Sequence, residues 1–152
     1  MKELSLVIEP KVGFGEIKFG DLSEKVIEYL GEADEIEEIP DEDGFNVVIL
    51  NYWEKGVSVF FEGVEKSVVS CFETDIPEAT LFGKKVFDMK EDDVIALMKE
   101  HGFEVAEKET EENGERRISY DDALIDFFFL DGEMIAVNWG VLVNEKGEIE
   151  EF

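Results

Sequence analysis

The chain has 152 residues, and its 40 Asp and Glu against 14 Lys and Arg give a formal net charge of −26 at pH 7. Nucleic-acid backbones and anionic membrane surfaces are bound through clustered Lys and Arg, so this charge excludes direct binding to either. Hydrophobic residues make up 44% of the chain and 13 residues are Phe, which excludes a disordered acidic tail and predicts a domain with a solid core.

The N-terminal residues, MKELSLVIEP, carry only a short apolar run, from Leu4 to Ile8. A secretory signal needs about 7–15 apolar residues in a row, so we expect no signal peptide. No stretch approaches the roughly 18 apolar residues of a membrane-spanning helix, so we expect no membrane segment. Cys71 is the single cysteine, which rules out an internal disulfide and is typical of a reducing compartment. The sequence therefore predicts a cytoplasmic protein.

Two parts of the chain resemble each other at a spacing of 68 residues. FGEIKFGDLSEKVIEYLGE, from Phe14, aligns with FGKKVFDMKEDDVIALMKE, from Phe82, and the same register continues without a gap through the segments that follow. One unbroken register over such a length predicts a duplication. We therefore expect a single domain, residues 1–152, built of two repeats at about 12–76 and 80–144.

The first repeat opens with a predicted helix. Glycines of VGFGEIKFG, from Val12, are expected to form turns before it. Asp21 and Glu24 then have the form of a capping box, and apolar residues follow at helical spacing until Gly31. Residues 5–9 are expected to add an edge strand. The segments after the helix are expected to be strands, at residues 35–39, 45–52, 57–61 and 66–72.

The second repeat shows the same pattern. Asp88 and Glu91 open a predicted helix that ends before Gly102. Asn113-Gly114 and Asp131-Gly132 are typical of tight hairpin turns, because both central residues of such a turn need positive φ angles. The tail, residues 141–152, is expected to add a further edge strand. The predicted strands lie at residues 103–108, 116–120, 124–130 and 134–139.

These elements predict an α+β fold: two tandem copies of a helix followed by an antiparallel β-meander, with the helices packed on one side of the sheet or sheets. Strand alternation predicts that Val57, Val59, Phe61, Ile125, Phe127 and Phe129 face the helices. Phe60 and Phe128 then lie on the opposite face. Either two sheets cover each other there, or an apolar surface is free for a partner.

The residues that enzymes and cofactors use are scarce. Asp41 and Asp43 weakly resemble the start of a calcium loop, but the expected Glu at its twelfth position is missing, which favours a solvated turn. One Cys and one His cannot build a zinc site of three or four N and S ligands. His101 ends the second helix, where its charge would complement the helix dipole. We therefore expect no catalytic residue, no resident metal and no cofactor.

The candidate binding residues combine exposed aromatics with carboxylates near turns. Trp53 is the aromatic residue best placed for exposure, since it stands beside two charged residues at a predicted turn. The two repeats share a tyrosine, Tyr52 in the first and Tyr120 in the second. The carboxylates that follow these tyrosines, Glu54 in the first repeat and Asp121 and Asp122 in the second, occupy equivalent places. The candidate partner-binding residues are Trp53, Glu54, Phe60, Asp121, Asp122, Asp126 and Phe128.

The pattern of short extended segment, helix and meander, given twice, resembles a known architecture. FGDLSEKVIEYLGEADEI, from Phe19, and FDMKEDDVIALMKEHGFEV, from Phe87, carry the resemblance. They are similar to the tandem α+β repeat of the β-lactamase-inhibitor-protein-like superfamily, which outer-membrane assembly lipoproteins of the small-protein-A type share. The resemblance implies a protein that binds other proteins through a concave sheet face and performs no chemistry.

The leading hypothesis is a non-enzymatic protein-binding module, specifically an acidic inhibitor or immunity-type protein for a basic target, because opposite charges steer association. Two alternatives stay open. One is a carboxylate-dependent hydrolase or metal-binding enzyme, and the other is a nucleic-acid mimic or a domain whose charge serves only solubility. The sequence does not predict the oligomeric state.

Overall fold

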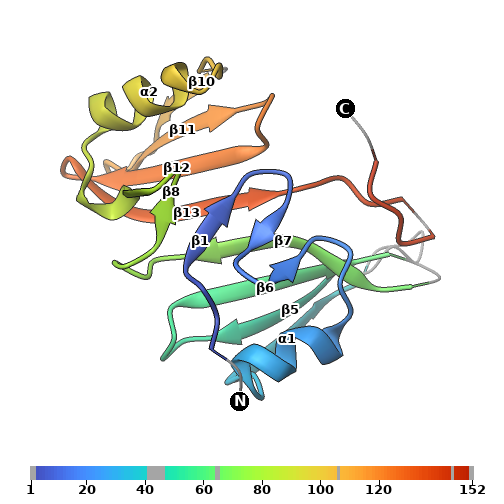
Figure 1. Ribbon diagram of the computed structural model, residues 1–152. Coiled ribbons are helices and arrows are strands. Elements are labelled where there is room, and N and C mark those ends of the chain that lie inside the picture. The colour runs from blue at the N-terminus through green and yellow to red at the C-terminus, as the bar shows by residue number, and fades with distance from the viewer. Residues whose placement is uncertain (1–2, 41–46, 64–65, 106, 145, 151–152) are drawn as a thin grey trace.

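A continuous eight-stranded antiparallel sheet forms the body of the protein, as the computed structural model shows (Figure 1). The structure describes residues 3–40, 47–63, 66–105, 107–144 and 146–150. The strand order across the sheet is β10–β11–β12–β13–β7–β6–β5–β4. The bounds are Glu35–Ile39 (β4), Val47–Tyr52 (β5), Val57–Glu62 (β6), Val68–Thr74 (β7), Glu107–Thr110 (β10), Arg116–Tyr120 (β11), Ile125–Leu130 (β12) and Glu133–Gly140 (β13).

A second sheet of five short strands lies against the first. Its order is β3–β2–β1–β8–β9, and β1 pairs with β8 in parallel while its other pairs are antiparallel. The parallel pair brings together segments that are more than 70 residues apart in the chain, since Val7 faces Thr80. The bounds are Val7–Glu9 (β1), Gly13–Phe14 (β2), Ile17–Lys18 (β3), Thr80–Leu81 (β8) and Lys84–Lys85 (β9).

Two short α-helices complete the fold, α1 at Ser23–Leu30 and α2 at Glu91–Glu100, with a 3₁₀ turn, η1, at Val86–Asp88. The helix prediction is confirmed for both segments, but the predicted capping box of α1 is wrong. Leu22 is the N-cap residue and no side chain caps the helix; the carboxylate of Asp21 accepts a hydrogen bond of 2.8 Å from the backbone N–H of Lys18. α2 has three acidic residues in its first turn, where carboxylates interact favourably with the helix dipole.

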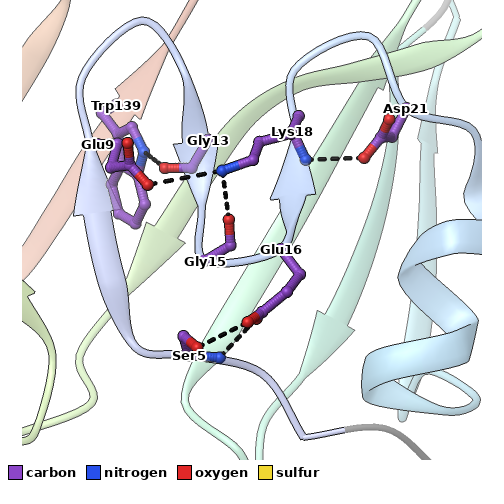
Figure 2. Close-up of polar contacts among 8 residues, drawn as sticks. All are labelled: Ser5, Glu9, Gly13, Gly15, Glu16, Lys18, Asp21 and Trp139. Atoms are coloured by element: carbon purple, nitrogen blue, oxygen red, sulfur yellow. Dashed lines mark hydrogen bonds and ion pairs between the residues drawn. The ribbon is translucent and has the colours of Figure 1, made fainter.

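The core lies between the eight-stranded sheet and the elements that cover one of its faces, which we call the inner face. Phe14 of β2 packs edge-on against Trp139 of β13 at 5.2 Å, and Phe72 of β7 stacks on the same indole at 5.4 Å. The indole N–H of Trp139 donates a buried hydrogen bond of 3.1 Å to the carbonyl of Gly13 (Figure 2). These contacts fix the five-stranded sheet on the middle of the larger one.

The helices cover the two ends of the same face. The hydroxyl of Tyr52 on β5 donates to the carbonyl of Gly31 at the end of α1, and Arg116 on β11 forms an ion pair with Glu91 of α2. Figure 1 shows α1 and α2 at opposite ends of the sheet with β1 between them. The six residues predicted to face the helices, including Val59 and Phe127, are all buried, which confirms that they point into the core.

The fold class predicted from the sequence is wrong. Strands take up 43% of the described residues and helices 15%, and the strands form sheets of eight and five, so the chain is predominantly β rather than an α+β fold of tandem helix-and-meander copies. The glycine-rich segment before α1, predicted to form turns, supplies β2 and β3. The pairing of β7 with β13 then merges the longer strands into one sheet.

The two predicted edge strands are also wrong. β1, within the predicted segment 5–9, lies at the centre of the five-stranded sheet and not at its edge. In the described part of the tail, the only strand-like pairing is an isolated bridge between Val143 and Ile149. Both segments had enough apolar residues to be read as strands, but the apolar pattern of a segment does not say which strand it will join.

Candidate protein-binding face

The outer face of the eight-stranded sheet is the face opposite the core, and strand register shows which side chains it carries. Phe60 on β6 faces Cys71 on β7, and Glu73 on β7 faces Asn138 on β13. Asn138 in turn faces Asp126 on β12. Cross-strand neighbours share a face, so these five side chains form one surface that runs over four strands.

Phe60 and Phe128 flank this surface without touching each other. Phe128 faces Ala136 on β13, whereas Phe60 is aligned through Cys71 with Gly140. Three strand spacings and four residues along β13 therefore put the two rings roughly 20 Å apart. Both rings are half-buried. The outer face thus has two separated apolar positions with a polar centre between them.

Three hollows lie along the outer face. The first, of about 320 Å³, is lined by residues that include Glu62, Cys71 and Asp126. The second, of about 490 Å³, lies beside Phe128 and Arg117. The third is smaller, about 120 Å³, and its lining includes Glu73 and Asp75. Arg117 is the only basic residue among the described residues that line any of the three.

The polar centre is connected by hydrogen bonds but not fully satisfied. The thiol of Cys71 donates to the side-chain oxygen of Asn138 at 3.4 Å, and the hydroxyl of Ser58 donates to that of Asn51 at 2.7 Å. Two donors, the amide nitrogen of Asn51 and the Nε of Arg117, are buried with no hydrogen-bond partner. A buried donor without a partner costs about 1–3 kcal/mol, so these two donors lower the stability of the fold locally.

Burial shapes the electrostatics of the same centre. It raises the pKa of the Cys71 thiol to about 12, and the carboxylates of Glu62 and Glu73 act in the same direction. Burial likewise raises the pKa of Glu73, with smaller contributions from Asp75 and Glu115, while a hydrogen bond from Asn138 lowers it. Cys71 is therefore a protonated thiol at neutral pH, which makes it a poor nucleophile.

The residues predicted to bind a partner are distributed over three places. Phe60, Asp126 and Phe128 lie on the outer face, as the register above shows. Asp121 and Asp122 are exposed in the turn between β11 and β12, and Asp121 also lines the 320 Å³ hollow.

Trp53 and Glu54 are exposed in the turn between β5 and β6. The Trp53 side chain is 59% exposed, lines the smallest hollow, and donates its indole N–H to Glu35 at 3.3 Å. The weak metal candidates Asp41 and Asp43 fall outside the described residues.

The sequence prediction missed Glu62, Glu73, Cys71 and Asn138 as members of this surface. In the sequence, polar and apolar residues alternate along β6, β7 and β13, and each of these four residues stands next to an apolar residue that is buried. Only the pairing of β7 with β13, between distant parts of the chain, places Glu73 opposite Asn138.

Comparison with protein-family models, with curated proteins and with solved structures finds no match. Within the described residues, no group of three or more His, Cys, Asp or Glu side chains could hold a metal ion. Nor is any helix in that part of the chain both long and apolar enough to cross a membrane. The narrower prediction of an inhibitor or immunity-type protein finds no support in the structure.

Proposed function

We propose that the protein is a non-enzymatic protein-binding module whose outer sheet face docks a basic protein. The observation that carries the proposal is the outer face itself: half-buried Phe60 and Phe128 flank a centre that carries Glu73, Asn138 and Asp126. Aromatic residues are enriched in protein interfaces and often act as anchors, and an interface also carries polar groups and hydrogen bonds.

The charge of the chain supports a basic partner. With a net charge of −26, the protein attracts cationic proteins over long range, and this raises the rate of encounter at low ionic strength. The carboxylates of the outer face would orient the partner toward that face, because Arg117 is the sole basic residue among the described residues that line the three hollows. Lys or Arg side chains of the partner would also relieve the poorly solvated carboxylate of Glu73.

The test is a selection followed by a quantitative comparison. Host protein fragments displayed on phage are selected against the immobilised chain, and the enriched fragment is measured by calorimetry at increasing salt. We expect a basic fragment whose affinity falls as salt rises. The variant Phe60→Ala/Phe128→Ala should weaken binding by at least about tenfold, as loss of anchor residues does in other interfaces.

The control is Val12→Ala, which removes an apolar side chain that is 43% exposed outside the outer face. It should bind as the unmodified chain does. The proposal fails if the double variant and the control bind equally well, or if the affinity of the enriched fragment does not respond to salt.

A further inference from the structure

We propose that β4 is a docking edge, on which an extended basic segment of the partner adds as a ninth strand to the eight-stranded sheet. The inference rests on the proposed function for the charge of the partner, but it concerns the edge of the sheet and not the middle of its outer face. β4 pairs with β5 through five consecutive positions, from Glu35 opposite Asn51 to Ile39 opposite Val47. Its other side pairs with no strand among the described residues, and the backbone N–H and C=O groups on that side are the ones an added strand would bind.

The side chains of β4 combine charged and apolar groups. All five residues are exposed, and two of them are large and apolar, with Ile36 62% and Ile39 53% exposed. Glu35 and Glu37 share the outer face with Ile39, whereas Ile36 and Glu38 lie on the inner side. Both sides of the edge therefore offer a carboxylate and an apolar contact to an incoming strand.

The opposite edge of the same sheet, β10, provides the decisive contrast. It is also exposed and acidic, but its charges are paired within the chain: Arg117 contacts Glu109 at 2.5 Å and Glu107 at 3.9 Å. Lys108 of β10 lies 3.9 Å from Glu91 of α2.

On β4, by contrast, the structure shows no ion pair between Glu35, Glu37 or Glu38 and any cation among the described residues. Glu35 accepts one hydrogen bond, from the indole of Trp53. Among the described residues, the two edges thus differ in their ion pairs: carboxylates of β10 have cations of the same chain beside them, and those of β4 do not.

This charge pattern selects the occupant. A second copy of the chain is disfavoured, because two β4 strands paired antiparallel about their centres would set Glu37 against Glu37, and like charges directly opposite are destabilising. A basic extended segment with Lys or Arg at alternate positions meets Glu35 and Glu37 on one face and Ile36 on the other. Five residues of strand span roughly 17 Å, so such a segment needs only five to seven residues.

The experiment is an NMR titration of the ¹⁵N-labelled full chain with the synthetic peptide Thr-Lys-Val-Lys-Val-Lys-Thr, blocked at both ends. We expect the amide signals of residues 35–39 and of β5 to shift in a saturable manner. A matched peptide, N-methylated on alternate backbone nitrogens, keeps the charge but cannot form the ladder of hydrogen bonds, and it should not shift them. The inference is overturned if both peptides give the same titration, or if the shifts appear at β10 and not at β4.

Two variants of equal charge change separate the edges. Glu35→Lys/Glu37→Lys should lower the affinity for the peptide by at least about fivefold. Glu107→Lys/Glu109→Lys should leave that affinity within about twofold of the unmodified chain's. Equal effects of the two would show general attraction to an acidic protein and overturn the inference. Circular dichroism of each variant checks that it is folded.

This test and the test of the proposed function can fail separately. If the selected fragment depends on Phe60 and Phe128 while the peptide leaves β4 unchanged, the docking edge is wrong and the proposed function stands. If the peptide binds β4 and no selected fragment depends on the two rings, the proposed function of the outer face is wrong and the docking edge stands.

Discussion

The hydroxyl of Tyr52 donates a hydrogen bond of 2.8 Å to the carbonyl of Gly31, and so ties β5 to the end of α1. Tyr120 lies on β11, 68 positions later in the chain, and its hydroxyl is buried with no hydrogen-bond partner. Burial raises the pKa of both phenols to about 12. The two tyrosines therefore form a natural comparison, in which one buried hydroxyl is satisfied and the other is not.

Removing the two hydroxyl groups should have opposite consequences. Tyr52→Phe loses a hydrogen bond and leaves the carbonyl of Gly31 without its side-chain partner, so we expect the free energy of unfolding to fall by about 1 kcal/mol. Tyr120→Phe removes a polar group that has no partner, so stability should stay the same or rise. Urea unfolding followed by tryptophan fluorescence measures both. Equal losses of unfolding free energy in the two variants would contradict the conclusion that one hydroxyl has a hydrogen-bond partner and the other has none.

The indole of Trp139 should contribute much more to stability than that of Trp53. Trp139 is fully buried and its N–H satisfies the carbonyl of Gly13, the contact that joins the two sheets (Figure 2). Trp139→Phe leaves that carbonyl unpaired and a gap in the core, which should cost about 2–4 kcal/mol. Trp53→Phe changes an exposed side chain and should alter stability by less than about 0.5 kcal/mol. Thermal unfolding followed by circular dichroism compares them, and similar losses would contradict the prediction.

The helices could be predicted from the sequence because their signal is local. Apolar residues at helical spacing mark both α1 and α2. The five-stranded sheet could not be predicted in the same way, because strands of two or three residues are too short to show any period. Its central pair, β1 with β8, is a contact between Ile8 and Leu81 that no local pattern encodes. This missing information is the physical reason why the predicted fold class was wrong.

The outer face was predictable only in part, for a similar reason. Alternation alone separates Phe60 and Phe128 from the buried residues beside them. The neighbours that make the surface polar depend on which strands meet, and Glu73 comes opposite Asn138 only because β7 pairs with β13. The charge state of Glu73 depends in turn on that pairing and on burial. Neither could be read from the residues near it in the chain.

Glu16 should titrate at a lower pH than an ordinary glutamate. The backbone N–H and the hydroxyl of Ser5 each donate to its carboxylate at 2.7 Å, and these bonds lower its pKa from 4.5, with the backbone bond contributing most (Figure 2). The contact therefore stabilises the fold above pH 4.5, and this contribution is lost as the pH falls through the folded pKa.

Side-chain ¹³C NMR of Glu16 against pH tests this contact. Ser5→Ala removes the hydroxyl donor and keeps the backbone donor, so the pKa of Glu16 should move back toward 4.5 without reaching it. No change in the variant would show that the hydroxyl contributes nothing.

Glu73 should have the opposite dependence on pH, because burial raises its pKa above 4.5. The folded state then binds the proton at a higher pH than the unfolded state does. The cost of holding this carboxylate charged is present in full above the folded pKa, and it is relieved as the pH falls toward 4.5. Glu73→Gln keeps the shape of the side chain and its ability to hydrogen-bond, so its melting temperature should exceed that of the unmodified chain at neutral pH. Below pH 4.5 the difference should disappear.

Glu78→Gln is the matched control, since it removes one negative charge from an exposed side chain. If it raises the melting temperature as much as Glu73→Gln, the effect is one of net charge and not of burial.

The carboxylate of Glu73 also links stability to binding. A cation of the partner seated beside Glu73 would lower its pKa, so binding near the folded pKa should release a proton. Calorimetry in buffers of different ionisation enthalpy detects that release, and Glu73→Gln should abolish it, because a glutamine has no proton to lose in this range.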